Sequence, residues 1–156
     1  PEIVSKLIVA DIAPRFYPVH HDAILEGLSA LDFEAITSRK EAEVQLSKYV
    51  QDLGTRQFLL KNIYRVSSEI LGLRINLETL KTNVSEVGEA LPSALNFQKD
   101  SLFLRGDKSE YISVQDETLI KLQFPAAVIK TISNAGHWLH AENPTEFYHN
   151  VRVFIT

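Results

Sequence analysis

Residues 136–144 read GHWLHAENP and join a predicted strand to a predicted helix. Residues 126–132, just before them, form a short apolar run typical of a strand in a parallel sheet. Asn143, with Pro144 and Glu146 behind it, is the signature of a capped helix over residues 143–154. His137 therefore lies on a loop at the carboxyl end of a strand, where open α/β sheets hold ligands and reactive side chains.

Two other short apolar runs predict strands. Residues 6–11 (KLIVAD) end in Asp11, and residues 101–104 (SLFL) lead into Arg105, Gly106 and Asp107. The first run resembles a strand that is buried on both faces, which marks it as central. With a helix predicted between the second and third strands, the alternation indicates an α/β protein with a mostly parallel sheet and right-handed crossovers.

The segment after the first strand is rich in helix signals. Residues 24–31 carry an apolar helical face, and Ser38 with Glu41 predicts a capping box for the next helix. The stripe of that helix runs to Gly54, which we expect at its C-terminal cap. Thr55 could cap a third helix, and one more helix is expected around residues 77–87.

So long a helical insertion exceeds a single crossover connection. We therefore predict a core domain made of residues 1–14 and 93–156, and a helical cap or lid over residues 15–92. Such a cap would cover the carboxyl ends of the strands, where ligands bind in these sheets.

The composition is that of a globular domain: 156 residues, 45% hydrophobic, 23% charged, with a formal net charge of −4. The charge gives no reason to expect nucleic acid or an anionic membrane as a partner, and no apolar run reaches the length of a membrane span. The chain has no cysteine, which excludes disulfides, thiolate catalysis and Cys-ligated metals within it. We expect cytoplasmic localisation, with an upstream targeting sequence left open.

The side chains with chemical potential follow the predicted strands. Asp11, Asp107 and His137 each stand at or just past a strand end, and these ends meet at one edge of a parallel sheet. An Asp–His pair there could hold an imidazole in the tautomer that accepts a proton from a serine. Taken singly, each acid could instead cap a turn, and the histidine could be a surface residue.

The remaining histidines do not predict a metal site. His20 and His21 are adjacent, so they cannot face one another on a helix or strand, and His140 could join His137 on a metal only if their loop were helical. We expect no metal and no cofactor.

The residues around both strand ends resemble a known family. Gly136-His137-Trp138, with Glu142 and Pro144, resembles the histidine segment of α/β-hydrolases, and residues 6–14 (KLIVADIAP) resemble the strand after the nucleophile helix in the YbfF-type esterase branch. Residues 21–24 (HDAI) and 57–61 (QFLLK) are similar to that branch as well. The resemblance covers the whole chain and implies the C-terminal part of an α/β-hydrolase fold with a helical cap insertion.

The nucleophile that this resemblance implies is a serine in a G-x-S-x-G turn between a strand and a helix. The nearest sequence is GLSAL at residues 27–31, which lacks the second glycine and lies within a helical pattern, so we interpret Ser29 as a helix-surface residue. We expect the nucleophile, with the first strands of the sheet, in a preceding N-terminal segment.

The acid departs from the usual superfamily pattern. Most members place it at the second Asp of G-D-x-D, and here that position is Ser109. The YbfF-type branch instead uses the Asp that ends the preceding strand, which corresponds to Asp11. The resemblance thus implies His137 and Asp11 as catalytic residues, with Asp107 in reserve.

Five aromatic side chains are candidates for substrate binding, namely Phe16, Tyr17, Phe58, Tyr64 and Trp138. Those of the cap could line an acyl pocket, although aromatic residues at helical spacing are more often core residues. Trp138 could equally pack behind the histidine.

The resemblance implies a serine hydrolase of carboxylic esters or acyl thioesters, acting through an acyl-enzyme. Its partners would be a small acyl ester or acyl-CoA substrate and the N-terminal half of the same fold, with neither nucleic acid nor membrane. The alternative is a catalytically inactive hydrolase fold used for binding, since a fold does not fix a function. A G-x-S-x-G sequence upstream would favour the enzyme.

Overall fold

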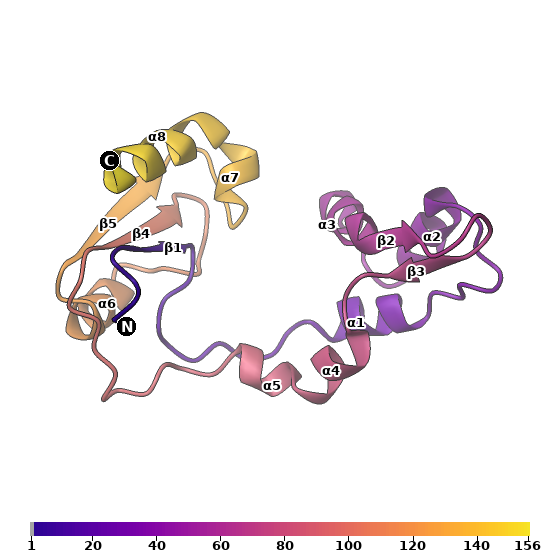
Figure 1. Ribbon diagram of the computed structural model, residues 1–156, viewed down its shortest axis with the longest axis horizontal. Coiled ribbons are helices and arrows are strands. Elements are labelled where there is room, and N and C mark those ends of the chain that lie inside the picture. The colour runs from indigo at the N-terminus through magenta and orange to yellow at the C-terminus, as the bar shows by residue number, and fades with distance from the viewer. Residues whose placement is uncertain (1) are drawn as a thin grey trace. The chain divides into compact units, whose positions relative to one another are not determined.

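The computed structural model describes residues 2–156 of the chain. It divides into two compact units, one made of Pro1–Phe16 with Ala90–Thr156 and the other of Tyr17–Glu89 (Figure 1). The first residue of the predicted core domain, Pro1, lies outside the described residues. Sequence placed the boundaries at residues 14/15 and 92/93, and the units divide at 16/17 and 89/90.

The first unit is built on a parallel sheet. Strands β1 (Leu7–Ala10), β4 (Ser101–Gly106) and β5 (Ala127–Ile132) lie in the order β1-β4-β5, and both pairings are parallel. The predicted α/β class with a mostly parallel sheet is therefore confirmed. Because the strands run the same way, their carboxyl ends meet at one edge, as the register Ala10↔Leu104 and Gly106↔Ile132 records.

Side chains of β4 alternate between the two faces of this sheet, as strand geometry requires. Leu102 and Leu104 pack with Leu139 of α7 (Leu139–Glu142) and with the half-buried apolar side chains of α8 (Pro144–Ile155). Phe103 instead meets Phe124, just past α6 (Asp116–Gln123), with ring centroids 5.1 Å apart. The sheet thus lies between α6 and the α7–α8 pair (Figure 1).

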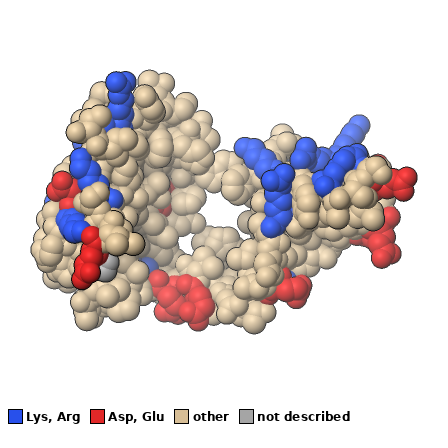
Figure 2. Space-filling view, in the orientation of Figure 1, with Lys and Arg blue, Asp and Glu red and all other residues tan. Residues whose placement is uncertain are grey.

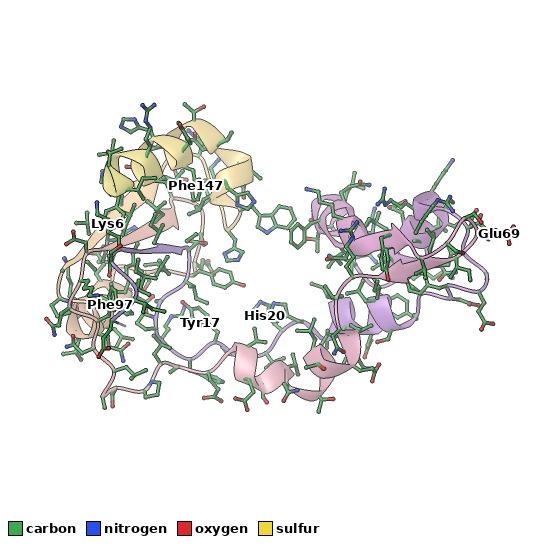
Figure 3. The ribbon with its side chains drawn as sticks, in the orientation of Figure 1. Lys6, Tyr17, His20, Glu69, Phe97 and Phe147 are labelled. Carbon is green, nitrogen blue, oxygen red and sulfur yellow. The ribbon has the colours of Figure 1, made fainter. Side chains whose placement is uncertain are left out.

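Helix α8 begins where the sequence predicts. Asn143 accepts a hydrogen bond from the N–H of Glu146 at 3.2 Å, and Pro144 occupies the first turn. Phe147, labelled in Figure 3, lies on the face of α8 that packs on the sheet. At the other end of this helix, the ammonium of Lys6 donates to the carbonyl of Phe154 at 2.7 Å, which ties the start of β1 to α8.

That the first strand is central stays a prediction, because the strands expected to flank it belong to a preceding segment. Among the described residues β1 pairs with β4 alone, and most of its side chains are only half-buried. The middle strand is β4, whose residues are almost all buried. An apolar run reports what covers the faces of a strand and carries no information on how many strands flank it.

The second unit is mainly helical and has its own apolar core. Its elements are α1 (Asp22–Ser29), α2 (Arg39–Leu46), α3 (Leu53–Leu59), a 3₁₀ turn (Leu60–Asn62), the antiparallel strands β2 (Ile63–Arg65) and β3 (Leu71–Leu73), α4 (Leu77–Thr82) and α5 (Val84–Val87). The backbone N–H of Tyr17 donates to the carbonyl of Gly88 at 2.8 Å, so the two ends of this unit are joined (Tyr17 is labelled in Figure 3).

The predicted start of α2 is confirmed and its predicted end at Gly54 is wrong, while the helix expected around residues 77–87 is present as α4 and α5. The Ser38 hydroxyl accepts the N–H of Glu41 at 3.3 Å, as predicted, while the Glu41 carboxylate accepts the N–H of Thr37 at 2.7 Å. Gly54 does not end that helix, because α2 stops at Leu46 and a new helix begins at Leu53. Asp52 caps the new helix by accepting the N–H of Thr55 at 2.7 Å.

The surface carries charges of both signs on both units, with basic side chains gathered over α2 and α3 (Figure 2). Across residues 2–156, none of the helices has both the length and the apolar character needed to cross a bilayer.

Candidate active site

Asp11 stands where β1 ends, and its backbone is unusual. Its φ of 52° lies in the left-handed region, which few residues other than glycine adopt and which costs about 1–3 kcal/mol. Its N–H still continues the sheet ladder by donating to the carbonyl of Leu104 at 2.7 Å. The chain therefore turns sharply at the strand end, with the side chain of Asp11 fully buried.

The Asp11 carboxylate receives hydrogen bonds from three directions. Nδ1 of His137 lies 2.9 Å from Oδ2, the hydroxyl of Ser109 also donates to Oδ2, and the N–H of Gly106 donates to Oδ1 at 3.1 Å. A buried carboxylate needs such donors, because its desolvation is otherwise expensive. The result is an acid held in one orientation, with one oxygen aimed at the imidazole.

Gly106, the last residue of β4, lets the histidine loop approach the sheet. A Cβ at this position would lie 2.2 Å from the carbonyl oxygen of Ala135 and 2.3 Å from that of Gly136. Any side chain would thus push the loop away from the strand. Because Gly106 has no side chain, the loop that carries His137 can lie against the same residue whose N–H donates to Asp11.

A second carboxylate fixes the histidine loop from its other side. Glu142, at the end of α7, accepts the N–H of Gly136 at 3.0 Å through one oxygen and the N–H of Trp138 at 3.1 Å through the other. These are the residues on either side of His137. Since both flanking peptide groups are anchored, the backbone of His137 is held at two points.

Ser109 and Tyr111 connect the acid to the base through the loop after β4. Besides donating to Asp11, the hydroxyl of Ser109 accepts the N–H of Tyr111 at 3.2 Å. The ring of Tyr111 stacks on the imidazole of His137, with centroids 4.0 Å apart and planes 22° from parallel. One short segment therefore contacts both members of the Asp–His pair.

Asp107, the reserve acid, has a different set of partners. Its two oxygens accept the N–H groups of Asn134 at 2.9 Å and Ala135 at 3.0 Å. These hydrogen bonds, that of Asn134 foremost, lower the pKa of the Asp107 carboxyl. Asn134 has a φ of 55°, so Asp107 stabilises a tight turn after β5, whereas the imidazole of His137 is bonded to Asp11.

The other candidate polar residues lie elsewhere. His140 is in α7, with its ring 6.2 Å from that of Phe147, and the rings of His20 and His21 stack at 4.3 Å. Burial and the neighbouring His20 lower the pKa of His21. In residues 2–156, no three His, Cys, Asp or Glu side chains gather in a way that could hold a metal ion.

Ser29 is the last residue of α1, and its hydroxyl donates back to the carbonyl of Leu25 at 2.7 Å. It is exposed, which agrees with its interpretation as a helix-surface residue.

The five predicted substrate-binding aromatic residues are divided between the units. Phe16 and Trp138 belong to the first unit, whereas Tyr17, Phe58 and Tyr64 belong to the second. Phe16 and Phe58 are 53% and 48% exposed, so the alternative reading of them as core residues is wrong. Tyr64 is half-buried on β2, with the guanidinium of Arg74 5.5 Å from its ring.

The geometry of the Asp–His pair defines what it can do chemically. With its proton on Nδ1, the imidazole donates to Asp11 and leaves Nε2 as a proton acceptor. The His137 side chain is 45% exposed while that of Asp11 is fully buried. The pair thus presents a fixed proton acceptor at an accessible edge of the sheet, which is the arrangement that general-base catalysis requires.

Three residues of the site were not singled out from sequence for these contacts. Ser109 was noted only as a replacement for the usual acid, Glu142 only as part of a motif, and Tyr111 not at all. Glu142 lies six residues after Gly136, and no helical pattern in the sequence predicts that its side chain contacts the histidine loop. Contacts of this kind depend on where two loops meet and leave no periodic pattern in the chain.

Curated proteins with similar sequences carry names of lipases and esterases. The chain is 33% identical over 161 residues to the sn-1-specific diacylglycerol lipase ABHD11 of Danio rerio, covering 99% of this chain and 50% of that protein. It is 31% identical to esterase YbfF of Escherichia coli, covering 97% of this chain and 58% of that protein. The chain thus spans about half the length of the curated relatives it matches. No family model matches it.

Solved structures are similar too. One titled a marine microorganism esterase is 38% identical, with a TM-score of 0.90, and the match covers 97% of this chain and 60% of that one. The E-2-(acetamidomethylene)succinate hydrolase structure, at 17% identity and a TM-score of 0.63, shares the fold.

Proposed function

We propose that this chain, which belongs to the α/β-hydrolase superfamily, is the histidine- and acid-bearing part of an enzyme that hydrolyses esters. The nucleophilic serine would come from a segment that precedes the chain, as the family resemblance implies. The acid would be Asp11, with Asp107 stabilising a turn.

The observation that carries this proposal is the bond between His137 and Asp11. Nδ1 of the imidazole is 2.9 Å from a carboxylate that is fully buried and that Gly106 and Ser109 also hold. An exposed surface pair would not need two further donors on the acid. This construction supports a role in which the imidazole must keep one tautomer and one orientation.

The chemistry follows from those positions. Nε2 of His137 would accept the proton of the serine hydroxyl as the serine oxygen attacks the acyl carbonyl, and Asp11 would stabilise the imidazolium that forms. The same imidazolium would then return the proton to the departing alkoxide or thiolate. Nε2 would next accept a proton from water as the water oxygen attacks the acyl-enzyme, and the imidazolium would give that proton to the serine oxygen as the carboxylic acid leaves.

The substrate class is a carboxylic ester or an acyl thioester. The second unit, Tyr17–Glu89, would act as the cap, and the aromatic side chains predicted to bind substrate stay candidates within their own units. The reaction needs neither a metal nor a cofactor, and we propose that it takes place in the cytoplasm.

A serine-directed fluorophosphonate tests the proposal on the full-length protein that contains this chain. We expect covalent labelling of one serine upstream of residue 1, together with hydrolysis of a short-chain aryl ester. Absence of both would favour the alternative, a hydrolase fold that binds without catalysis.

Substitution of the two nearby histidines supplies the matched control. His137→Ala should lower turnover by several orders of magnitude while the thermal midpoint stays near that of wild type, because a general base is lost and the fold is kept. His140→Ala, in the adjacent helix, should change turnover little. Equal losses in the two variants would point to a shared structural role and count against His137 as the base.

A further inference from the structure

The ring of Tyr111 covers one face of the His137 imidazole. Their centroids are 4.0 Å apart and their planes differ by 22°, so the two rings are stacked. Tyr111 is half-buried, whereas the His137 side chain is 45% exposed. The stack therefore restrains an imidazole that solvent would otherwise leave mobile about its last side-chain bond.

The segment that carries Tyr111 is itself held in place. The N–H of Tyr111 donates to the hydroxyl of Ser109, Arg15 donates to the carbonyl of Glu110 at 3.4 Å, and Ile112 is 2% exposed. The next residue, Ser113, donates through both its N–H and its hydroxyl to Asp116, each at 2.8 Å. Because this loop is anchored at several points, the ring of Tyr111 forms a fixed surface against which the imidazole packs.

We propose that Tyr111 is a positioning residue that sets the plane of the His137 ring. The bond to Asp11 fixes Nδ1 at one point, and one hydrogen bond still allows the ring to swing around it. The stack removes this freedom, so Nε2 points in one direction. The consequence for catalysis rests on the function proposed above, while the restraint on the ring does not.

Stacking also suits the change of charge that the reaction requires. When the imidazole accepts a proton it becomes a cation, and the face of an electron-rich ring attracts cations. Tyr111 would therefore contact both protonation states, with the charged one favoured. Phenylalanine keeps the face of the ring and should preserve most of the effect, whereas leucine removes it.

The kinetic test compares Tyr111→Leu and Tyr111→Phe in the full-length protein, with Tyr148→Leu as the matched control. Tyr148 is 62% exposed on α8 of the same unit. We expect Tyr111→Leu to lower kcat about threefold to tenfold with KM within about twofold, as an aromatic pair of ordinary strength implies. Tyr111→Phe should recover at least half of the wild-type kcat, and Tyr148→Leu should equal wild type. A loss of kcat in Tyr111→Phe as large as in Tyr111→Leu would overturn the proposal.

An NMR measurement separates this inference from the proposed function, because it needs no activity. The Nδ1 proton of His137, bonded to a buried carboxylate, should give a far-downfield resonance that exchanges slowly with water. We expect Tyr111→Leu to broaden that resonance and Tyr111→Phe to keep it; an unchanged resonance in Tyr111→Leu would refute the positioning role. If Tyr111→Leu does not fold, Tyr111→Met, with a flexible side chain of similar bulk, takes its place with the same expected outcomes. If the wild-type protein has no esterase activity but the resonance changes as expected in the Tyr111 variants, the proposed function is contradicted and the positioning role of Tyr111 is not.

Discussion

Replacing Asp11 by asparagine reverses donors and acceptors at the centre of the site. The carboxylate accepts from Gly106, Ser109 and His137, whereas an amide has one acceptor oxygen and an NH₂ group. If the amide oxygen keeps the rigid backbone N–H of Gly106, the NH₂ group faces the other two partners. The imidazole must then accept at Nδ1, which moves its own proton to Nε2.

This tautomer cannot take a proton from a serine, so the expected loss is large. We expect turnover to fall about a thousandfold or more, equivalent to about 4 kcal/mol in the barrier. The fold should survive, because the amide has nearly the same volume as the carboxylate and the hydroxyl of Ser109 can rotate to accept from it. The change in the free energy of unfolding should stay within about 1–3 kcal/mol, the usual range for altered buried hydrogen bonds.

The assay is kcat on a short-chain aryl ester, with thermal melts to show that each variant is folded. Asp107→Asn is the matched control, since Asp107 has the same side chain at the end of the neighbouring strand and bonds to Asn134 and Ala135 instead. It should stay within about tenfold of wild type. A larger loss in Asp107→Asn than in Asp11→Asn would make Asp107 the acid, and near-normal turnover in both would refute orientation of the imidazole by either.

Two further predictions concern carboxylates outside the pair. Glu142→Ala should lower kcat about tenfold, because the peptide groups on both sides of His137 lose their anchor, and a kcat equal to wild type would contradict this. Burial raises the pKa of Asp116, but hydrogen bonds from Ser113 and the guanidinium of Arg15 outweigh it and lower the pKa overall. Its contribution to stability is therefore complete above its unfolded pKa of about 3.9 and is lost as the pH falls through the lower folded pKa. In urea unfolding, the free energy of unfolding of Asp116→Asn should be lower than that of wild type by on the order of 1 kcal/mol at pH 7. This difference should become smaller below about pH 4, and a larger difference there would refute the prediction.

The layout of the first unit was predictable because its signals are local and strong. Strands β1, β4 and β5 are short apolar runs with clear ends, and the residues that cap α8 at Asn143 are close together in the sequence. In the second unit the signals compete. The apolar stripe of α2 continued in the sequence past Leu46, and Thr55 was the predicted cap of the next helix, whereas that helix begins at Leu53 with Asp52 as its cap. The hairpin of β2 and β3 has strands of 3 residues each, too short to produce a readable alternation.

The same distinction applies to the candidate site. Asp11, Asp107 and His137 could be proposed from sequence because each follows a strand and parallel strands bring their ends together, and the family resemblance then favoured Asp11 over Asp107. Ser109 and Tyr111 belong to a loop, whose path no periodicity describes, and they reach the pair only because the loop after β4 folds back over the edge of the sheet.

The replacement at Ser109 illustrates what is lost when a residue is judged alone. As a substitute for the usual acid, a serine cannot stabilise an imidazolium, and the family resemblance therefore implied Asp11 as the acid. In the structure its hydroxyl donates to Asp11 and its oxygen accepts the N–H of Tyr111, so it supports the acid that stands at the end of the other strand. A carboxylate at this position would face the buried Asp11 as a like charge, which is costly. An acid at the end of β1 therefore requires a neutral donor in the loop after β4, and the departure from the usual pattern at Ser109 is the physical counterpart of the acid at Asp11.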